Sequence, residues 1–198
     1  MKRKTLPASL SFAALAALSP SLHACDSKAD VEAAFNAQHQ APWRIETRST
    51  TDTGVVQTQQ FDILPPDRIY RKVTSGEETA ETIAVGTTAW MNEGSGWQEM
   101  KKGVADIVAT QLRAMLAPAR VSVEFKCLDK VDYDGKSYLG YQTVSETVEG
   151  KLLARTILVD PETKRPAFNI VAAPDLSGEP VMKEAYSYPT DIRIDSPL

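Results

Sequence analysis

Hydrophobic and polar residues alternate along much of the chain after residue 42, in short runs separated by turn residues. In the first run, Trp43 and Ile45 stand at every second position, which is the side-chain period of a half-buried β-strand. Turn residues such as Pro65-Pro66-Asp67 and Asp134-Gly135 separate later runs, and Asp-Gly is typical of a tight hairpin. About ten such runs, at spacings of about eight to twelve residues, indicate an antiparallel sheet or an open barrel.

Two segments have the helical period instead. Residues 27–39 place Val31 and Phe35 on one face, and Ser27 with Asp30 three positions later predicts a capping box at the start of this helix. Residues 104–116 carry apolar residues at intervals of three and four, and Met115 in this stripe suits an irregular surface. We therefore expect an α+β fold: a curved antiparallel half-barrel sheet with an N-terminal helix and a lid or plug helix.

The concave face of such a half-barrel holds either packed side chains or an apolar ligand. Val121, Val123, Phe125 and Cys127 alternate with polar residues and predict a strand with this apolar side inward. Arg71 also occupies a predicted inward position, either at a sheet edge with its stem packed on apolar surface or as a cation at the mouth of a pocket. From strand and helix parity we predict that a ligand pocket is lined by Trp43, Ile45, Ile83, Val85, Trp90, Ile107, Leu112, Met115, Val121, Val123 and Phe125.

The first 24 residues have the three-part pattern of a secretory signal peptide. Lys2, Arg3 and Lys4 form a positive start, an apolar run follows, and Ala24 is the small residue expected before a cleavage site. The apolar run is too short to cross a bilayer. We therefore expect residues 1–24 to be a signal peptide and residues 25–198 to form a single exported domain.

Two cysteines leave two alternatives open for the start of this domain. Leu22-His23-Ala24-Cys25 resembles the lipobox of bacterial lipoproteins, although His23 departs from that pattern, so Cys25 is a candidate for lipidation. Alternatively, Cys25 pairs with Cys127, which an oxidising exported compartment favours. The second alternative predicts a soluble periplasmic protein, and the first a protein anchored by lipid at a membrane surface that faces the periplasm.

Composition and charge exclude several classes of function. The 198 residues carry 22 basic and 26 acidic side chains, and three of the basic ones lie in the predicted signal peptide, so the remaining domain has a net charge of −7. Nucleic-acid binding needs a basic face. His39 is the only histidine after residue 24, and a zinc site needs three or four ligands. No nucleophile and base stand in a recognisable motif. We therefore expect no nucleic-acid partner, metal, cofactor or enzymatic activity.

Six short motifs follow one another along the chain. The motifs are Pro66-Asp67-Arg68-Ile69-Tyr70, Glu81-Thr82-Ile83-Ala84-Val85-Gly86 with Thr88-Ala89-Trp90, Gly96-Trp97-Gln98, Val131-Asp132-Tyr133-Asp134-Gly135-Lys136 leading to Tyr141, and Leu158-Val159-Asp160-Pro161-Glu162-Thr163. In that order and spacing they cover about residues 33–171 and resemble the LolA-like superfamily of periplasmic lipoprotein carriers, which includes lipid-binding lipoproteins of the LppX/LprG type. The resemblance implies a curved antiparallel half-barrel closed by helices, with a hydrophobic cavity for acyl chains and no catalytic residues.

These observations predict a bacterial envelope protein that binds or carries a hydrophobic ligand, such as a lipid or a lipoprotein acyl chain. The alternative is an envelope sensor or interaction module of the same fold, which contacts another protein through its acidic surface and transports no ligand.

Overall fold

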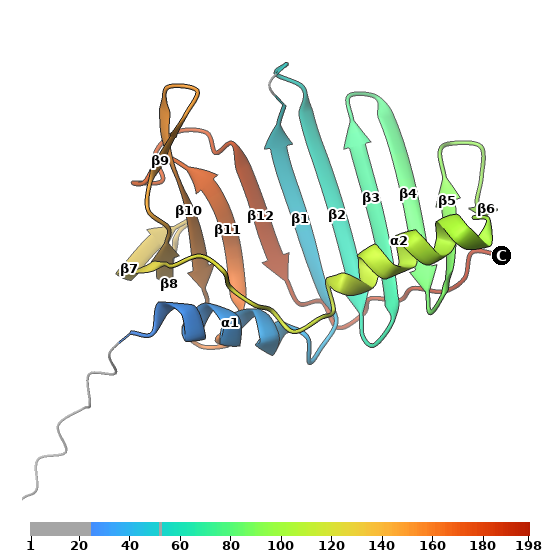
Figure 1. The fold of residues 1–198 in the computed structure, drawn as a ribbon, viewed down its shortest axis with the longest axis horizontal. Coiled ribbons are helices and arrows are strands. Elements are labelled where there is room, and N and C mark those ends of the chain that lie inside the picture. Colours follow the sequence, from blue (N-terminus) through green and yellow to red (C-terminus); the bar gives the residue numbers. More distant parts are fainter. Residues whose placement is uncertain (1–24, 52) are drawn as a thin grey trace, which may run out of the picture.

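The structure, a computed structural model, describes residues 25–51 and 53–198, so the predicted signal peptide lies outside the described residues. It consists of one antiparallel sheet with two helices along one side, which confirms the expected α+β class (Figure 1). The helices are α1 (Ser27–Gln38) and α2 (Lys102–Ala114). The strands are β1 (Trp43–Thr50), β2 (Val56–Leu64), β3 (Arg68–Ser75), β4 (Glu78–Val85), β5 (Thr88–Asn92), β6 (Gln98–Glu99), β7 (Lys126–Tyr133), β8 (Lys136–Gln142), β9 (Glu146–Val148), β10 (Lys151–Val159), β11 (Pro166–Ala172) and β12 (Met182–Ser187).

The strand order places the last strand, β12, in the middle of the sheet. The order is β6-β5-β4-β3-β2-β1-β12-β11-β10-β8-β7, and β9 pairs with β10 only. Strand β12 therefore joins the meander of β1 to β6 to the strands that follow α2 (Figure 1). Asp134 and Gly135, both at positive φ, make the predicted hairpin turn between β7 and β8.

Both helices cover the same face of the sheet, here called the helix face, and the other is called the outer face. Under α2, the register aligns Trp43 with Ile63, Ile63 with Ile69, and Ile69 with Ala84, so that these buried residues share the helix face. They form one core with Ala105, Ala109 and Leu112 of α2. The two alanines let α2 lie close to the strands because their side chains are short.

Helix α1 packs a second core against the other half of the sheet. Val31 and Ala34 are buried there together with Phe125 and Ile157. The cap of this helix is Asp26, one residue before the predicted cap Ser27: the Asp26 carboxylate accepts a hydrogen bond from the Ala29 amide at 3.2 Å. The predicted capping box was therefore wrong, because the Ser27 hydroxyl donates instead to the Phe125 carbonyl at 2.7 Å.

Residues 116–125, here called the strap, connect α2 to β7. The prediction of a strand from residue 121 was wrong, because β7 begins only at Lys126. Two backbone donors of the strap bond to side chains of α1 rather than to a neighbouring strand. The Ala119 amide donates to Asn36 Oδ1 and the Val121 amide to Glu32 Oε1, both at 2.8 Å. The strap is thereby held along α1.

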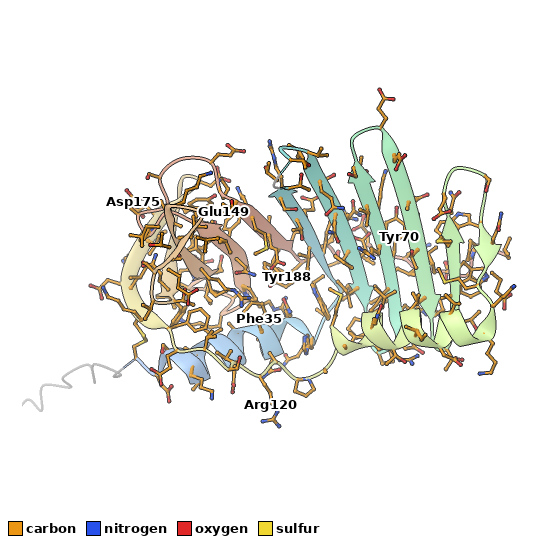
Figure 2. The ribbon with its side chains drawn as sticks, turned by 45° about the horizontal axis from the view of Figure 1, so that its top comes forward. Phe35, Tyr70, Arg120, Glu149, Asp175 and Tyr188 are labelled. Carbon is orange, nitrogen blue, oxygen red and sulfur yellow. A yellow bond between two sulfur atoms is a disulfide. The ribbon has the colours of Figure 1, made fainter. Side chains whose placement is uncertain are left out.

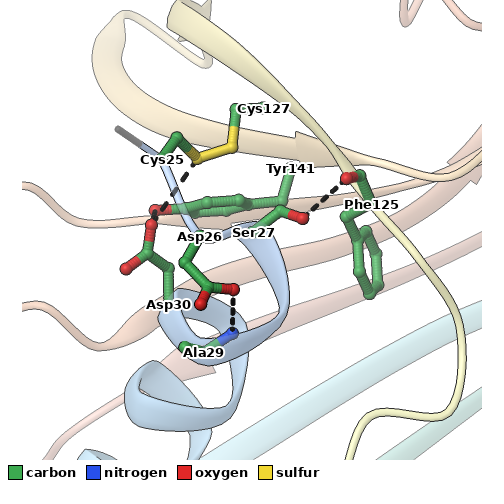
Figure 3. Close-up of a disulfide and its surroundings, with 8 residues drawn as sticks. All are labelled: Cys25, Asp26, Ser27, Ala29, Asp30, Phe125, Cys127 and Tyr141. Atoms are coloured by element: carbon green, nitrogen blue, oxygen red, sulfur yellow. Dashed lines mark hydrogen bonds between the residues drawn. A yellow bond between two sulfur atoms is a disulfide. The ribbon is translucent and has the colours of Figure 1, made fainter. Parts of the chain in front are cut away.

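A disulfide joins Cys25, just before α1, to Cys127 in β7, with the two Cα atoms 6.5 Å apart (Figure 3). This confirms the pairing alternative. The lipidation alternative is not compatible with it, since the Cys25 sulfur that would carry the lipid is bonded to Cys127. Among the described residues, neither helix is long and apolar enough to cross a membrane.

Candidate functional site

Two adjoining cavities open on the helix face beside α1. The first, about 260 Å³, lies between α1, the strap and β10, and the second, about 420 Å³, lies beside the β9–β10 hairpin. Both are lined by Val123 and Arg155, so we treat them as one site, the groove. Its apolar lining residues are Val31, Phe35, Ala119, Val121, Val123, Phe125 and Ile157 in the first cavity, and Val144, Val148, Leu153, Ala154 and Val171 in the second.

The walls of the first cavity are fixed by local sequence. Val31 and Phe35 are one helical turn apart on α1, so both side chains face the sheet, and Figure 2 shows Phe35 on that side. The strap forms the opposite wall and is hydrogen-bonded to α1. The disulfide fastens the beginning of α1 to β7 just beyond the strap (Figure 3). The first cavity is therefore held open by bonds on both sides.

One cation of the groove is oriented by a chain of hydrogen bonds. Arg155 Nε donates to Asn169 Oδ1 at 2.9 Å, and Asn169 Nδ2 donates to Glu184 Oε2 at 2.6 Å. The Tyr186 hydroxyl donates to the same Glu184 oxygen at 2.7 Å. Burial and the neighbouring Glu184 carboxylate raise the pKa of Tyr186 well above its usual value, so its hydroxyl stays a donor. Asn169, at the centre of this chain, is only 2% exposed.

Other charged residues line the groove without such support. Arg120 lines the first cavity but is exposed, and its side chain points away from the sheet in Figure 2. Glu124 and Glu146 line the second cavity and are exposed. Among the described residues, neither carboxylate forms an ion pair with the Arg155 guanidinium, since neither lies within 4.0 Å of it.

The structure separates the eleven predicted pocket residues into four environments. The groove is lined by Val121, Val123 and Phe125. The core between α2 and the sheet contains Trp43, Ile45, Leu112 and Met115. The register places on the outer face Ile83, Val85 and Trp90. Solvent reaches 60% of the surface of Ile107. Contact of any of these side chains with a ligand stays a prediction.

Several residues of the groove were not predicted from the sequence. Phe35 and Val31 were recognised as a helix face, which is the signal that could have found them. Arg155 and Ile157 are two positions apart on β10 and therefore share a face of the sheet. The groove forms because β10 lies under α1 and the strap. The hydrophobic pattern within a single strand does not reveal that arrangement.

Arg71 lies on the helix face of β3, as predicted, but β3 has neighbours on both sides and is no edge strand. Its guanidinium packs over the Phe61 ring at 5.5 Å, and Nη2 donates to Gln59 Oε1 at 3.2 Å. Its Nε is buried without a hydrogen-bond partner in the described structure. The packed guanidinium favours the reading in which the stem and head cover apolar surface.

In residues 25–51 and 53–198, no three His, Cys, Asp or Glu side chains are grouped to bind an ion. His39 instead stacks on Trp43 with ring centroids 5.1 Å apart, and burial lowers its pKa.

No known protein family and no curated protein matches the sequence. Among solved structures, the chain is similar to MucB in the MucA/MucB complex of Pseudomonas aeruginosa, at 10% identity and a TM-score of 0.44, over 84% of this chain and 59% of that one. It thus spans about three fifths of the length of the MucB chain. It is also similar to a putative outer membrane lipoprotein-sorting protein domain from Vibrio parahaemolyticus, at 7% identity and a TM-score of 0.30, over 83% of this chain and 93% of that one.

A further similar structure is that of the LolA superfamily protein NE2245 from Nitrosomonas europaea, at 13% identity and a TM-score of 0.31, over 83% of this chain and 92% of that one.

Proposed function

We propose that this protein is an exported bacterial envelope protein that binds a hydrophobic ligand, such as an acyl chain, in the groove. The observation that carries the proposal is the pair of adjoining cavities with apolar walls on the helix face. Ligand sites are commonly apolar hollows of about 300–1,000 Å³ with a few polar groups. The second cavity, at about 420 Å³, is within that range by itself.

The proposed location has two supports. Residues 1–24 have the pattern of a signal peptide. The disulfide between Cys25 and Cys127 fits an oxidising compartment such as the periplasm, because thiols stay reduced in the cytosol. The lining of the groove includes neither His nor Cys, which favours binding over catalysis.

Native mass spectrometry of the protein purified from the periplasm tests the proposal, together with displacement of a neutral fluorescent lipid probe. Val123 offers a selective variant because it lines both cavities and is 45% exposed, so Val123→Asp should leave the fold intact. We expect this variant to lose bound apolar molecules and probe affinity by about tenfold or more. Val104→Asp is the matched control, since Val104 is similarly exposed, at 53%, but lies on α2. An empty wild-type protein that binds no probe would contradict the proposal.

A second function, binding of an envelope protein partner, is favoured by a different surface. Val104 and Ile107 of α2 are one helical turn apart and both largely exposed. An apolar pair on an outer helix surface is a common anchor for a protein partner. Affinity capture in moderate salt should then recover one stoichiometric protein with the wild type and lose it with Val104→Asp. Recovery of lipid alone with both forms would exclude this second function.

A further inference from the structure

We propose that the ligand of the groove is an anionic amphiphile, and that Arg155 binds its carboxylate or phosphate head while the acyl chain lies in the second cavity. This inference rests on the proposed function and adds the chemical class of the ligand. It is carried by the position, the orientation and the unused donors of Arg155.

Arg155 stands at the junction of the groove, since it lines both cavities. Among its side-chain nitrogens, only Nε has a hydrogen-bond partner in the described structure, namely Asn169 Oδ1. The N–H groups of its two terminal nitrogens are left to other acceptors. A guanidinium with both terminal nitrogens available matches the two oxygens of a carboxylate or phosphate.

The hydrogen bonds behind Arg155 fix its orientation before a ligand arrives. Asn169 is buried in β11, and its amide donates to Glu184 in the neighbouring β12, which also accepts from the Tyr186 hydroxyl. Burying such polar side chains costs free energy unless each of them is hydrogen-bonded. Apolar side chains in the same positions would pack equally well. Asn169 also separates the Glu184 carboxylate from the guanidinium, so Arg155 is oriented but not directly paired. We therefore assign Asn169 and Glu184 as positioning residues.

The surrounding charges place the head of the ligand. Glu124 and Glu146 line the second cavity together with its valines and would repel an anion there. The first cavity has no acidic side chain in its lining. An anionic head therefore fits at the junction, on the side of the first cavity. The acyl chain extends past Val123 along the apolar wall that Val144, Val148 and Val171 supply.

Four probes test the inference by their affinities for the purified, oxidised protein: dodecanoate, dodecyl phosphate, dodecanol and inorganic phosphate. We expect the two anionic amphiphiles to bind at least about tenfold more tightly than dodecanol, with a preference that falls as salt is added. Arg155→Gln should remove the preference and leave the affinity for dodecanol unchanged. Arg193→Gln is the matched control, because Arg193 is exposed and lines neither cavity, and it should keep the preference.

Glu184→Gln tests the positioning role without changing size. It should lower the anion preference severalfold while dodecanol binding stays constant, whereas a merely structural role would weaken all three alkyl probes alike. Thermal unfolding of each variant checks that the fold is retained.

The outcomes separate the inference from the proposed function. Equal affinities for dodecanoate, dodecyl phosphate and dodecanol would overturn the anionic head and leave the apolar groove standing. Binding of none of the alkyl probes would overturn the proposed function itself. Inorganic phosphate that binds as tightly as dodecyl phosphate would show that a free anion, not an amphiphile, occupies Arg155.

Discussion

Phe125 combines a structural and a binding role in one side chain. It is 8% exposed, belongs to the core under α1 and also lines the first cavity. We expect Phe125→Ala to lower the free energy of unfolding by about 3 kcal/mol, the lower end of the usual cost, because part of its surface already faces a cavity. Urea unfolding measures this, with the exposed Val144→Ala as a control that should change little. A loss below about 1 kcal/mol would contradict its place in the core.

Asp160 makes part of the stability depend on pH. The Lys136 ammonium, at 2.6 Å, and the backbone N–H groups of Thr163 and Glu162, each at 2.9 Å, lower the pKa of Asp160 to about 2. Because the folded pKa lies below the unfolded one, the stabilisation is complete above about pH 4 and is lost as the pH falls towards 2.

We therefore expect the destabilisation caused by Asp160→Asn to become smaller as the pH falls. At pH 7 the variant should be less stable than the wild type by on the order of 1–2 kcal/mol, since the partly exposed Lys136 is screened by water. Near pH 2 the two proteins should have similar stabilities. Unfolding in urea at both pH values measures this, and a difference that is the same at both would contradict the mechanism.

At the scale of elements, the disulfide links α1 to the far edge of the sheet. Cys25 and Cys127 are 102 residues apart in the sequence, and closing so long a loop restricts the unfolded chain strongly. The variant with both Cys25→Ser and Cys127→Ser should lose about 2–4 kcal/mol of stability in urea unfolding. The intact mass of the wild type should be about 2 Da below that of its reduced form. Equal stability of the two proteins would show that the bridge constrains little.

The strap depends on two side chains of α1. Glu32→Ala removes the acceptor of the Val121 amide and leaves that donor without its partner. Amide hydrogen exchange at Val121 should then accelerate by about tenfold or more, because the local opening that exchange requires becomes easier. The Ala119 amide, which Asn36 accepts, serves as the internal control in the same measurement and should change less. Unchanged exchange at Val121 would contradict the role of Glu32.

At the scale of the whole molecule, β12 holds the two halves of the sheet together. It pairs with β1 on one side and β11 on the other. A chain that ends at residue 181 should therefore fail to unfold in one cooperative transition, because two unpaired strand edges replace two ladders of hydrogen bonds. Circular dichroism during heating measures this. Removal of residues 196–198 is the control and should preserve the transition.

The sequence predicted the fold well and the site poorly, for reasons of geometry. Alternation and turn residues are local, so strands such as the one beginning at Trp43 and the Asp134-Gly135 hairpin could be predicted. Which face a strand turns to its helices depends on the register with its neighbours. For that reason Ile83 and Trp90, apolar and alternating like Trp43, were assigned to the wrong side of the sheet.

Two other differences have the same origin. Residues 121–125 alternate because one side of the strap packs on α1, and an extended strap has the same period as a strand. Arg155 owes its orientation to Asn169 and Glu184, which lie on two other strands. Contacts between segments that are distant in the sequence cannot be predicted from the local pattern of hydrophobic and polar residues.

The central place of β12 also sets the order in which the molecule can be completed. Residues 182–187 emerge from the ribosome after all the other strands and, if the chain is exported unfolded, leave the translocation pore after them as well. Until then β1 and β11 each present an open row of backbone donors and acceptors that another chain could occupy. Nascent protein therefore passes through an interval in which it is most vulnerable to aggregation and most dependent on chaperones. Arrival of the final strand ends that interval.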